Sequence, residues 1–130
     1  MRSVYDAIKA LFTIRPVTAT ATQTGSAVDT KGYNSAAVVL EVGTVSGTTP
    51  TLDVKVQECA TSGGTYTDIS GATFTQVTAT DNSQILRIEG LGTSRQRYLK
   101  VVGTIAGTSP SFAFGVEILL GRAFREPVNA

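Results

Sequence analysis

Apolar and polar residues alternate along most of the chain, which is the pattern of β-strands with one buried face. In residues 51–58, for example, Leu52, Val54 and Val56 share one side, and charged or amide side chains occupy the other. Gly, Pro, Ser and Asn separate the alternating runs and mark the turns between them. The pattern predicts strands over residues 17–22, 35–42, 51–58, 65–69, 73–78, 83–89, 96–105 and 111–120.

The apolar side of these runs defines the expected core. Several short strands with alternating patterns and frequent turns indicate a sandwich or a barrel rather than a parallel sheet with crossover helices. The inner faces of two sheets would then be built from Val38, Leu40, Leu52, Val54, Val56, Leu86, Ile88, Phe112, Phe114, Val116 and Ile118.

A segment of the chain occurs twice, sixty positions apart, at residues 42–56 and 102–116. Each copy follows an apolar run, crosses a Gly/Thr/Pro segment and enters another extended run, which predicts a β-hairpin used twice. The copies are not fully equivalent, because Leu40 corresponds to Lys100, so the relation is a pseudo-symmetry. The identical positions are Val42, Gly43, Thr44, Gly47, Thr48, Pro50 and Val56, which recur as Val102, Gly103, Thr104, Gly107, Thr108, Pro110 and Val116.

Residues 3–14 differ from the rest of the chain because their apolar positions have helical spacing. Ser3 is suited to the N-cap and Pro16 would end the pattern. A helix of about three turns is not stable alone, so it must pack on the sandwich or on a neighbouring subunit. The apolar positions are Val4, Ile8, Leu11 and Phe12.

These patterns together predict an all-β fold, an antiparallel β-sandwich of jelly-roll type with a short N-terminal helix or arm. At 130 residues the chain is long enough for a single core. We expect a helical arm over 1–16, a β-sandwich domain over 17–120 and a C-terminal tail over 121–130.

Charge argues against nucleic acid and membrane partners. Eleven basic and ten acidic residues are interspersed, for a net charge of +1, whereas a phosphate-binding face needs clustered cations. The one basic cluster, at Arg95, Arg97 and Lys100, is interpreted as a solvated strand edge. No apolar stretch is long enough to span a bilayer. No signal-peptide core is present at the start of the given sequence, so we expect cytoplasmic synthesis.

The residues of common catalytic and metal sites are missing or scattered. There is no histidine, so neither a Ser-His-Asp nor a Cys-His site can form. Cys59 is the only cysteine and has no cation beside it in the sequence to lower its thiol pKa. The ten carboxylates are spread along the chain without calcium-loop spacing. We therefore predict a protein that is not an enzyme and has no catalytic residue, metal or cofactor.

A sugar-binding sandwich is the alternative from the binding-module class. Such sites use exposed aromatic rings, and the chain has no Trp and four Tyr. Tyr33 and Tyr66 lie in turn-like segments where they could stack on sugar rings.

Several segments resemble small structural proteins encoded in the head-gene clusters of tailed bacteriophages and prophages. The resemblance rests on Val4-Tyr5-Asp6, on the Thr/Ala run after Pro16, on Gly63-Gly64-Thr65-Tyr66-Thr67-Asp68-Ile69 followed by Gly71-Ala72-Thr73-Phe74, and on Arg125-Glu126-Pro127. It covers most of the chain. It implies a capsid decoration (cement) protein or, less often, a tail component.

The resemblance and the residue patterns lead to one functional prediction. The chain is expected to be a virion structural protein that binds the capsid surface as a homo-oligomer and bridges subunits of the major capsid protein, after synthesis in the host cytoplasm. A tail or head–tail joining protein is the alternative within the same class. The residues expected to contact partners are Val4, Ile8, Leu11, Phe12, Arg122, Arg125 and Glu126.

Overall fold

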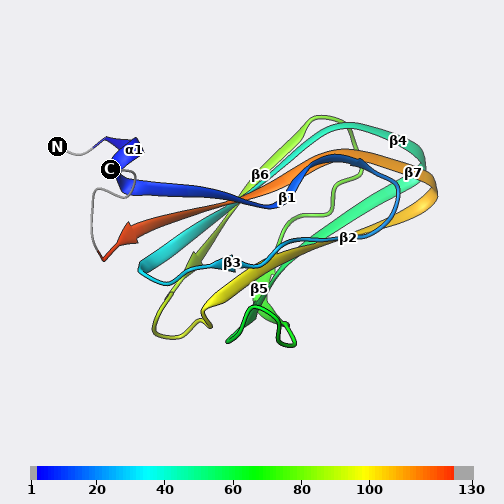
Figure 1. Ribbon diagram of the computed structural model, residues 1–130. Coiled ribbons are helices and arrows are strands. Elements are labelled where there is room, and N and C mark those ends of the chain that lie inside the picture. Colours follow the sequence, from blue (N-terminus) through cyan, green and yellow to red (C-terminus); the bar gives the residue numbers. More distant parts are fainter. Residues whose placement is uncertain (1–2, 125–130) are drawn as a thin grey trace.

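The computed structural model describes residues 3–124 and has an all-β fold, as predicted (Figure 1). The described strands belong to one antiparallel sheet. In chain order, the elements are α1 (Val4–Ala7), β1 (Ile8–Ala19), β2 (Gln23–Thr24), β3 (Val28–Asp29), β4 (Tyr33–Cys59), β5 (Thr67–Thr73), β6 (Asn82–Glu89) and β7 (Tyr98–Ala123).

The two long strands, β4 and β7, fold this sheet into two layers. They pair with each other from Tyr33↔Ala123 to Cys59↔Tyr98, and both curve around one end of the molecule (Figure 1). The first layer contains β1, residues 111–123 of β7, residues 33–46 of β4, and β6. The second contains β2 and β3, residues 98–106 of β7, residues 51–59 of β4, and β5.

The repeated segments form the corner between the layers, so the prediction of two hairpins was wrong. Each copy continues as one strand through its Gly/Thr/Pro segment, and the two copies pair with one another. The crossing is close: a β-carbon on Gly47 would lie 2.6 Å from the carbonyl oxygen of Ser109, and one on Gly107 would lie 2.8 Å from that of Thr49. Both glycines have positive φ, 111° and 122°. Glycine is therefore required at both positions for space and for backbone conformation.

A register shift explains why the two repeats do not face the same way. The pairing of β4 with β7 shifts between Val42 and Val45, after which strand alternation is displaced by one residue. Val42 is therefore buried, whereas its repeat counterpart Val102 is only half-buried. At the shift, two backbone groups of β4 form hydrogen bonds with the segment before β6. Val45 N donates to Thr80 Oγ1 at 3.1 Å, and Gly43 O accepts from Asp81 N at 2.9 Å.

The core lies between the layers and confirms the predicted inner faces. Ten of the eleven predicted residues are buried, and Leu86 is partly buried against the same cluster. The layers meet at Gly103, where a β-carbon would lie 3.2 Å from Cζ of Phe114. Removing these apolar side chains from water is the main stabilisation of the fold.

One side of the sandwich is closed by the buried side chain of Thr13. Its Oγ1 donates to Ser26 O at 2.8 Å and accepts from Val101 N at 3.2 Å, and its carbonyl accepts from Ser26 N at 2.6 Å. These bonds link β1 in the first layer to the second layer. Gly25 must remain small here, because a β-carbon would lie 2.2 Å from Thr13 Oγ1.

The prediction of a helix over residues 3–14 was wrong beyond its first turn. Ser3 caps α1 as expected, since its Oγ accepts from Asp6 N at 3.3 Å. From Ile8 onward the chain is strand β1, paired with β7 from Ile8↔Gly121 to Ala19↔Phe112. Backbone pairing along β7 satisfies more groups than a short helix could, so tertiary context overrides the local spacing. The boundary expected at residues 16–17 therefore falls inside a strand, and the one expected at 120–121 falls inside β7.

Candidate interaction surface

The outward side of the first layer, here called the outer face, carries a contiguous group of apolar side chains. Phe12 pairs with Glu117, Glu117 with Val39, and Val39 with Ile85, so one row crosses β1, β7, β4 and β6. Ile85 is 70% exposed and Phe12 is 42% exposed. Outward positions of a solvated strand are normally polar, and a contiguous apolar group on a surface marks an interaction site. The outer face consists of Ala10, Phe12, Ala37, Glu41, Val39, Ile85, Arg87, Glu117 and Leu119.

The outer face also contains the charged residues Arg87 and Glu117. Glu117 is half-buried, and Arg87 lies on strand β6. Within residues 3–124, no hydrogen bond or ion pair involves either side chain. Glu41 differs, because its Oε2 accepts from Ser83 Oγ at 2.5 Å.

A groove of about 730 Å³ extends the outer face toward β1 and the corner. Its lining comes from β1, β7 and β4 and includes Val17, Gly43 and Ala113. Pro16 lies across β7 there, since a β-carbon on Gly115 would be 3.2 Å from Pro16 Cα. The groove is therefore mainly apolar and has Glu41 and Glu117 among its lining residues.

The predicted partner-contact residues do not form one helical stripe. Val4 in α1 is 73% exposed, whereas Ile8 and Leu11 are half-buried in β1. Phe12 is the member that reaches the outer face. Arg122 is exposed at the end of β7, where its carbonyl accepts from Asn34 Nδ2 at 2.8 Å. Arg125 and Glu126 lie outside the described residues.

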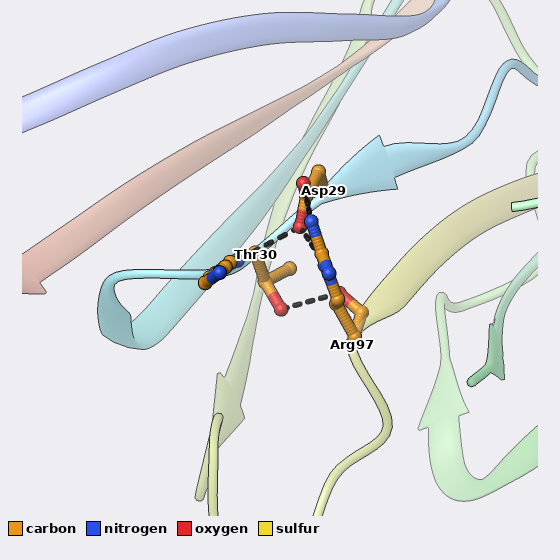
Figure 2. Close-up of polar contacts among 4 residues, drawn as sticks. Asp29, Thr30 and Arg97 are labelled. Carbon is orange, nitrogen blue, oxygen red and sulfur yellow. Dashed lines mark hydrogen bonds and ion pairs between the residues drawn. The ribbon is translucent and has the colours of Figure 1, made fainter. Parts of the chain in front are cut away.

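The basic cluster lies at the start of β7 and in the segment just before it, and each of its cations is engaged. Arg97 forms a double ion pair with Asp29, with Nε–Oδ1 at 2.8 Å and Nη2–Oδ2 at 2.7 Å (Figure 2). Arg95 Nη1 lies 3.4 Å from Glu58 Oε2, and the Lys100 ammonium lies 4.2 Å from the centre of the Tyr66 ring. All three cations of the cluster are therefore engaged by other residues of the chain.

The Asp29–Arg97 pair also ties β3 to the start of β7. The hydrogen bond from Arg97 lowers the pKa of the Asp29 carboxyl to about 2, with a smaller contribution from Lys31 N. The same bond raises the pKa of Arg97. Thr30 Oγ1 donates to the Arg97 carbonyl (Figure 2). These contacts account for both charges structurally.

Cys59 and the acidic residues were the other residues considered for a catalytic or metal site. Cys59 is buried, and a β-carbon on Gly64 would lie 2.6 Å from its Sγ. Within residues 3–124, no group of three or more Cys, Asp or Glu residues is arranged to hold a metal ion. The same residues contain no helix long and apolar enough to cross a membrane.

The two tyrosines considered for sugar stacking both contact other residues of the chain. Tyr33 packs against the core cluster. The Tyr66 hydroxyl donates to Ser62 O at 2.8 Å, and Lys100 covers one side of its ring. Burial raises the pKa of Tyr66.

The outer face was missed at the sequence level although a signal was present. Inward positions of residues 35–42 and 111–120 were recognised as apolar, but some outward positions there are apolar too, including Ala37, Val39 and Leu119. A strand that is apolar on both sides must be covered on both sides.

Comparison with known proteins gives no family assignment. No protein-family model matches the sequence, and no curated protein matches it. Among solved structures, the SPBc2 prophage-derived protein YomS has 11% identity and a TM-score of 0.45, covering 92% of this chain and 98% of that one. A structure described as Bacillus endospore appendages, disulfide-linked pili, has 17% identity and a TM-score of 0.46, covering 88% of each chain.

A family two carbohydrate esterase from Cellvibrio japonicus is also similar, at 12% identity and a TM-score of 0.36, with coverage of 92% of this chain and 35% of that one. All three TM-scores lie below 0.5. The functions of these proteins are therefore not transferred to this chain, and the functional conclusion rests on its own residues.

Proposed function

We propose that the chain is a non-enzymatic structural protein of a tailed-phage or prophage virion, which decorates the capsid and stabilises it by bridging capsid subunits. The observation that carries this proposal is the apolar outer face, crossed by the row Phe12, Glu117, Val39 and Ile85. An exposed apolar sheet face on a folded domain is typical of a subunit that is covered by another chain in its assembly.

A second exposed region supports the bridging role. Val4 is 73% exposed and Phe124 is 65% exposed, and α1 and the end of β7 lie at the same end of the molecule (Figure 1). This end is distinct from the middle of the outer face. A subunit with two such surfaces can contact two neighbours at once, which is what a bridging protein requires.

The engaged polar residues support a structural role over the alternatives. The contacts of Asp29, Arg97, Tyr66 and Lys100 hold strands and loops of the chain together. The virion as the location and the major capsid protein as the partner are what the sequence resemblance to phage head-gene products implies. A tail or head–tail joining protein would present the same surfaces and differs in copy number.

Copy number in purified particles tests this proposal. The particles are digested and this chain is quantified against the major capsid protein by mass spectrometry with labelled peptides. A decoration protein is present in amounts comparable to the capsid protein, whereas a tail or connector protein is present in few copies. Absence from washed particles would contradict the proposal in both forms.

A further inference from the structure

We propose that the outer face is covered by the outer face of a second copy of this chain, in a two-fold symmetric dimer in which Arg87 of each copy pairs with Glu117 of the other. This inference rests on the proposed function and deepens it, because it names the first partner of the outer face. A two-fold dimer brings the same surface of both copies together, so that surface must be complementary to itself.

The apolar part of the outer face meets this requirement. Ala37 and Val39 lie on its central strand β4, with Leu119 beside Ala37 on β7 and Ile85 beside Val39 on β6. Small and medium aliphatic side chains on flat strands can approach those of a second sheet at the usual separation of about 10 Å. Burying Ile85, which is 70% exposed in the single chain, removes the largest apolar exposure on this face from water.

The charges make the face self-complementary. Arg87 pairs across the strands with Ala37, and Glu117 pairs with Val39, so the cation and the anion lie diagonally on opposite sides of β4. One strand, β4, lies between them, so their strands are two strand spacings or about 10 Å apart. Among residues 3–124, neither of them forms an ion pair. A two-fold axis that passes over the Ala37–Val39 segment exchanges the two positions. Each Arg87 then meets the Glu117 of the other copy, and two ion pairs form per dimer.

The half-buried carboxylate of Glu117 gives the second copy a specific role. A carboxylate between Phe12 and Val39 loses solvation as the face is covered, and an unpaired charge there would oppose any purely apolar partner. A face-to-face copy supplies the required guanidinium at the matching position, from Arg87, which forms no ion pair among residues 3–124.

Complementary charge reversal tests the dimer in the purified protein, without particles. Sedimentation velocity gives the dimer dissociation constant of the full chain and of Arg87→Glu and Glu117→Arg, each of which places like charges at both contacts. We expect each variant alone to raise the dissociation constant at least tenfold. An equal mixture of the two variants is expected to recover dimers, because both contacts are then again between opposite charges. Only a contact between two copies predicts this recovery.

Two further variants separate a loss of contact from a loss of fold. Ile85→Lys, at an exposed position, should abolish the dimer while the melting temperature of the monomer stays unchanged. Thr104→Glu adds a charge at an exposed position of the second layer and should leave the dimer intact. A chain that is monomeric at every concentration, or a mixture that fails to recover dimers, would overturn this inference. Copy number in particles is measured independently, so failure of the dimer is distinguishable from failure of the virion role.

Discussion

Thr48 and Thr108 occupy equivalent positions of the sequence repeat, and they pair with each other across β4 and β7. The pairs on either side follow the same symmetry, since Ser46↔Ser111 corresponds to Thr51↔Ala106. A local two-fold axis therefore passes between the two threonines. The repeat exists because the fold needs the same corner twice, once in each long strand. This relationship explains why Gly and Pro recur at identical positions of both copies.

Gly47 is expected to be the least tolerant position of this corner. Gly47→Ala places a β-carbon against the Ser109 carbonyl at a φ of 111°, and should lower the free energy of unfolding by about 2 kcal/mol or more. Gly63→Ala is the matched control, because a β-carbon there would meet no atom within 4 Å. Chemical denaturation of both variants measures the difference. Equal stability of the two would contradict the account of the corner.

Replacing Thr49 with a residue that tolerates a left-handed conformation should increase the stability of the fold. Its φ is 47°, and that of its repeat counterpart Ser109 is 48°. A left-handed conformation costs a branched residue about 1–2 kcal/mol, and Asn tolerates it better. Thr49→Asn is therefore expected to stabilise the fold by about 0.5–1 kcal/mol. A lower denaturation midpoint for this variant would show that the threonine side chain makes a contact that outweighs the strain.

Phe114 provides the test of the core between the layers. Its ring is 3% exposed and lies against Gly103 of the opposite layer. Phe114→Ala should cost about 3–5 kcal/mol, through lost burial and the cavity that remains. If unfolding measurements gave a change below roughly 1 kcal/mol, the inward orientation of this strand would be wrong.

Two N-terminal truncations should have opposite outcomes. Deleting residues 1–7 removes α1 and leaves every strand, so we expect a folded sheet with a nearly unchanged melting temperature. Deleting residues 1–15 also removes Thr13 and Ile14, which are 3% and 5% exposed, and should cost at least about 3 kcal/mol. Circular dichroism melts compare the two. A stable, folded chain lacking residues 1–15 would mean that β1 is an arm rather than part of the sheet.

The Asp29–Arg97 pair predicts a defined pH dependence. The pKa of Asp29 is about 2 in the folded protein, against the ordinary value of 3.8. Because the folded state holds this proton less tightly than the unfolded chain, the stabilisation is complete above about pH 4 and is lost as the pH falls through 2. Asp29→Asn should therefore be less stable than the parent chain at neutral pH, and the two should converge near pH 2. A difference in melting temperature that does not change over this range would contradict the assignment.

Alternation was sufficient to predict the core, because burial on one face leaves a local signal in the sequence. It did not give every strand, since the two strands predicted over 65–69 and 73–78 are the single strand β5 (Thr67–Thr73). The alternation of Leu52, Val54 and Val56 with polar residues can be recognised without knowing which strand they pair with. The conformation of residues 8–14, in contrast, could not be predicted without knowing the partner strand. Their spacing is compatible with a helix, and the pairing of β1 with β7 depends on a strand about a hundred residues away.

The corner and the outer face required the same distant information. A Gly/Thr/Pro segment can reverse a chain or bend a continuous strand, and the choice here depends on the pairing between copies sixty positions apart. Likewise Phe12, Val39 and Ile85 are unremarkable one by one. They become a surface only because β1, β7, β4 and β6 bring them into one row.

Rebinding to particles that lack this chain tests the virion role most directly. Purified protein is added to such particles, free protein is removed by sedimentation, and the bound amount and the temperature of shell disruption are measured. If the chain decorates the capsid, binding is saturable in proportion to the major capsid protein, and the disruption temperature of the shell rises. Failure to sediment with the shells, or binding without any change in their stability, would contradict it.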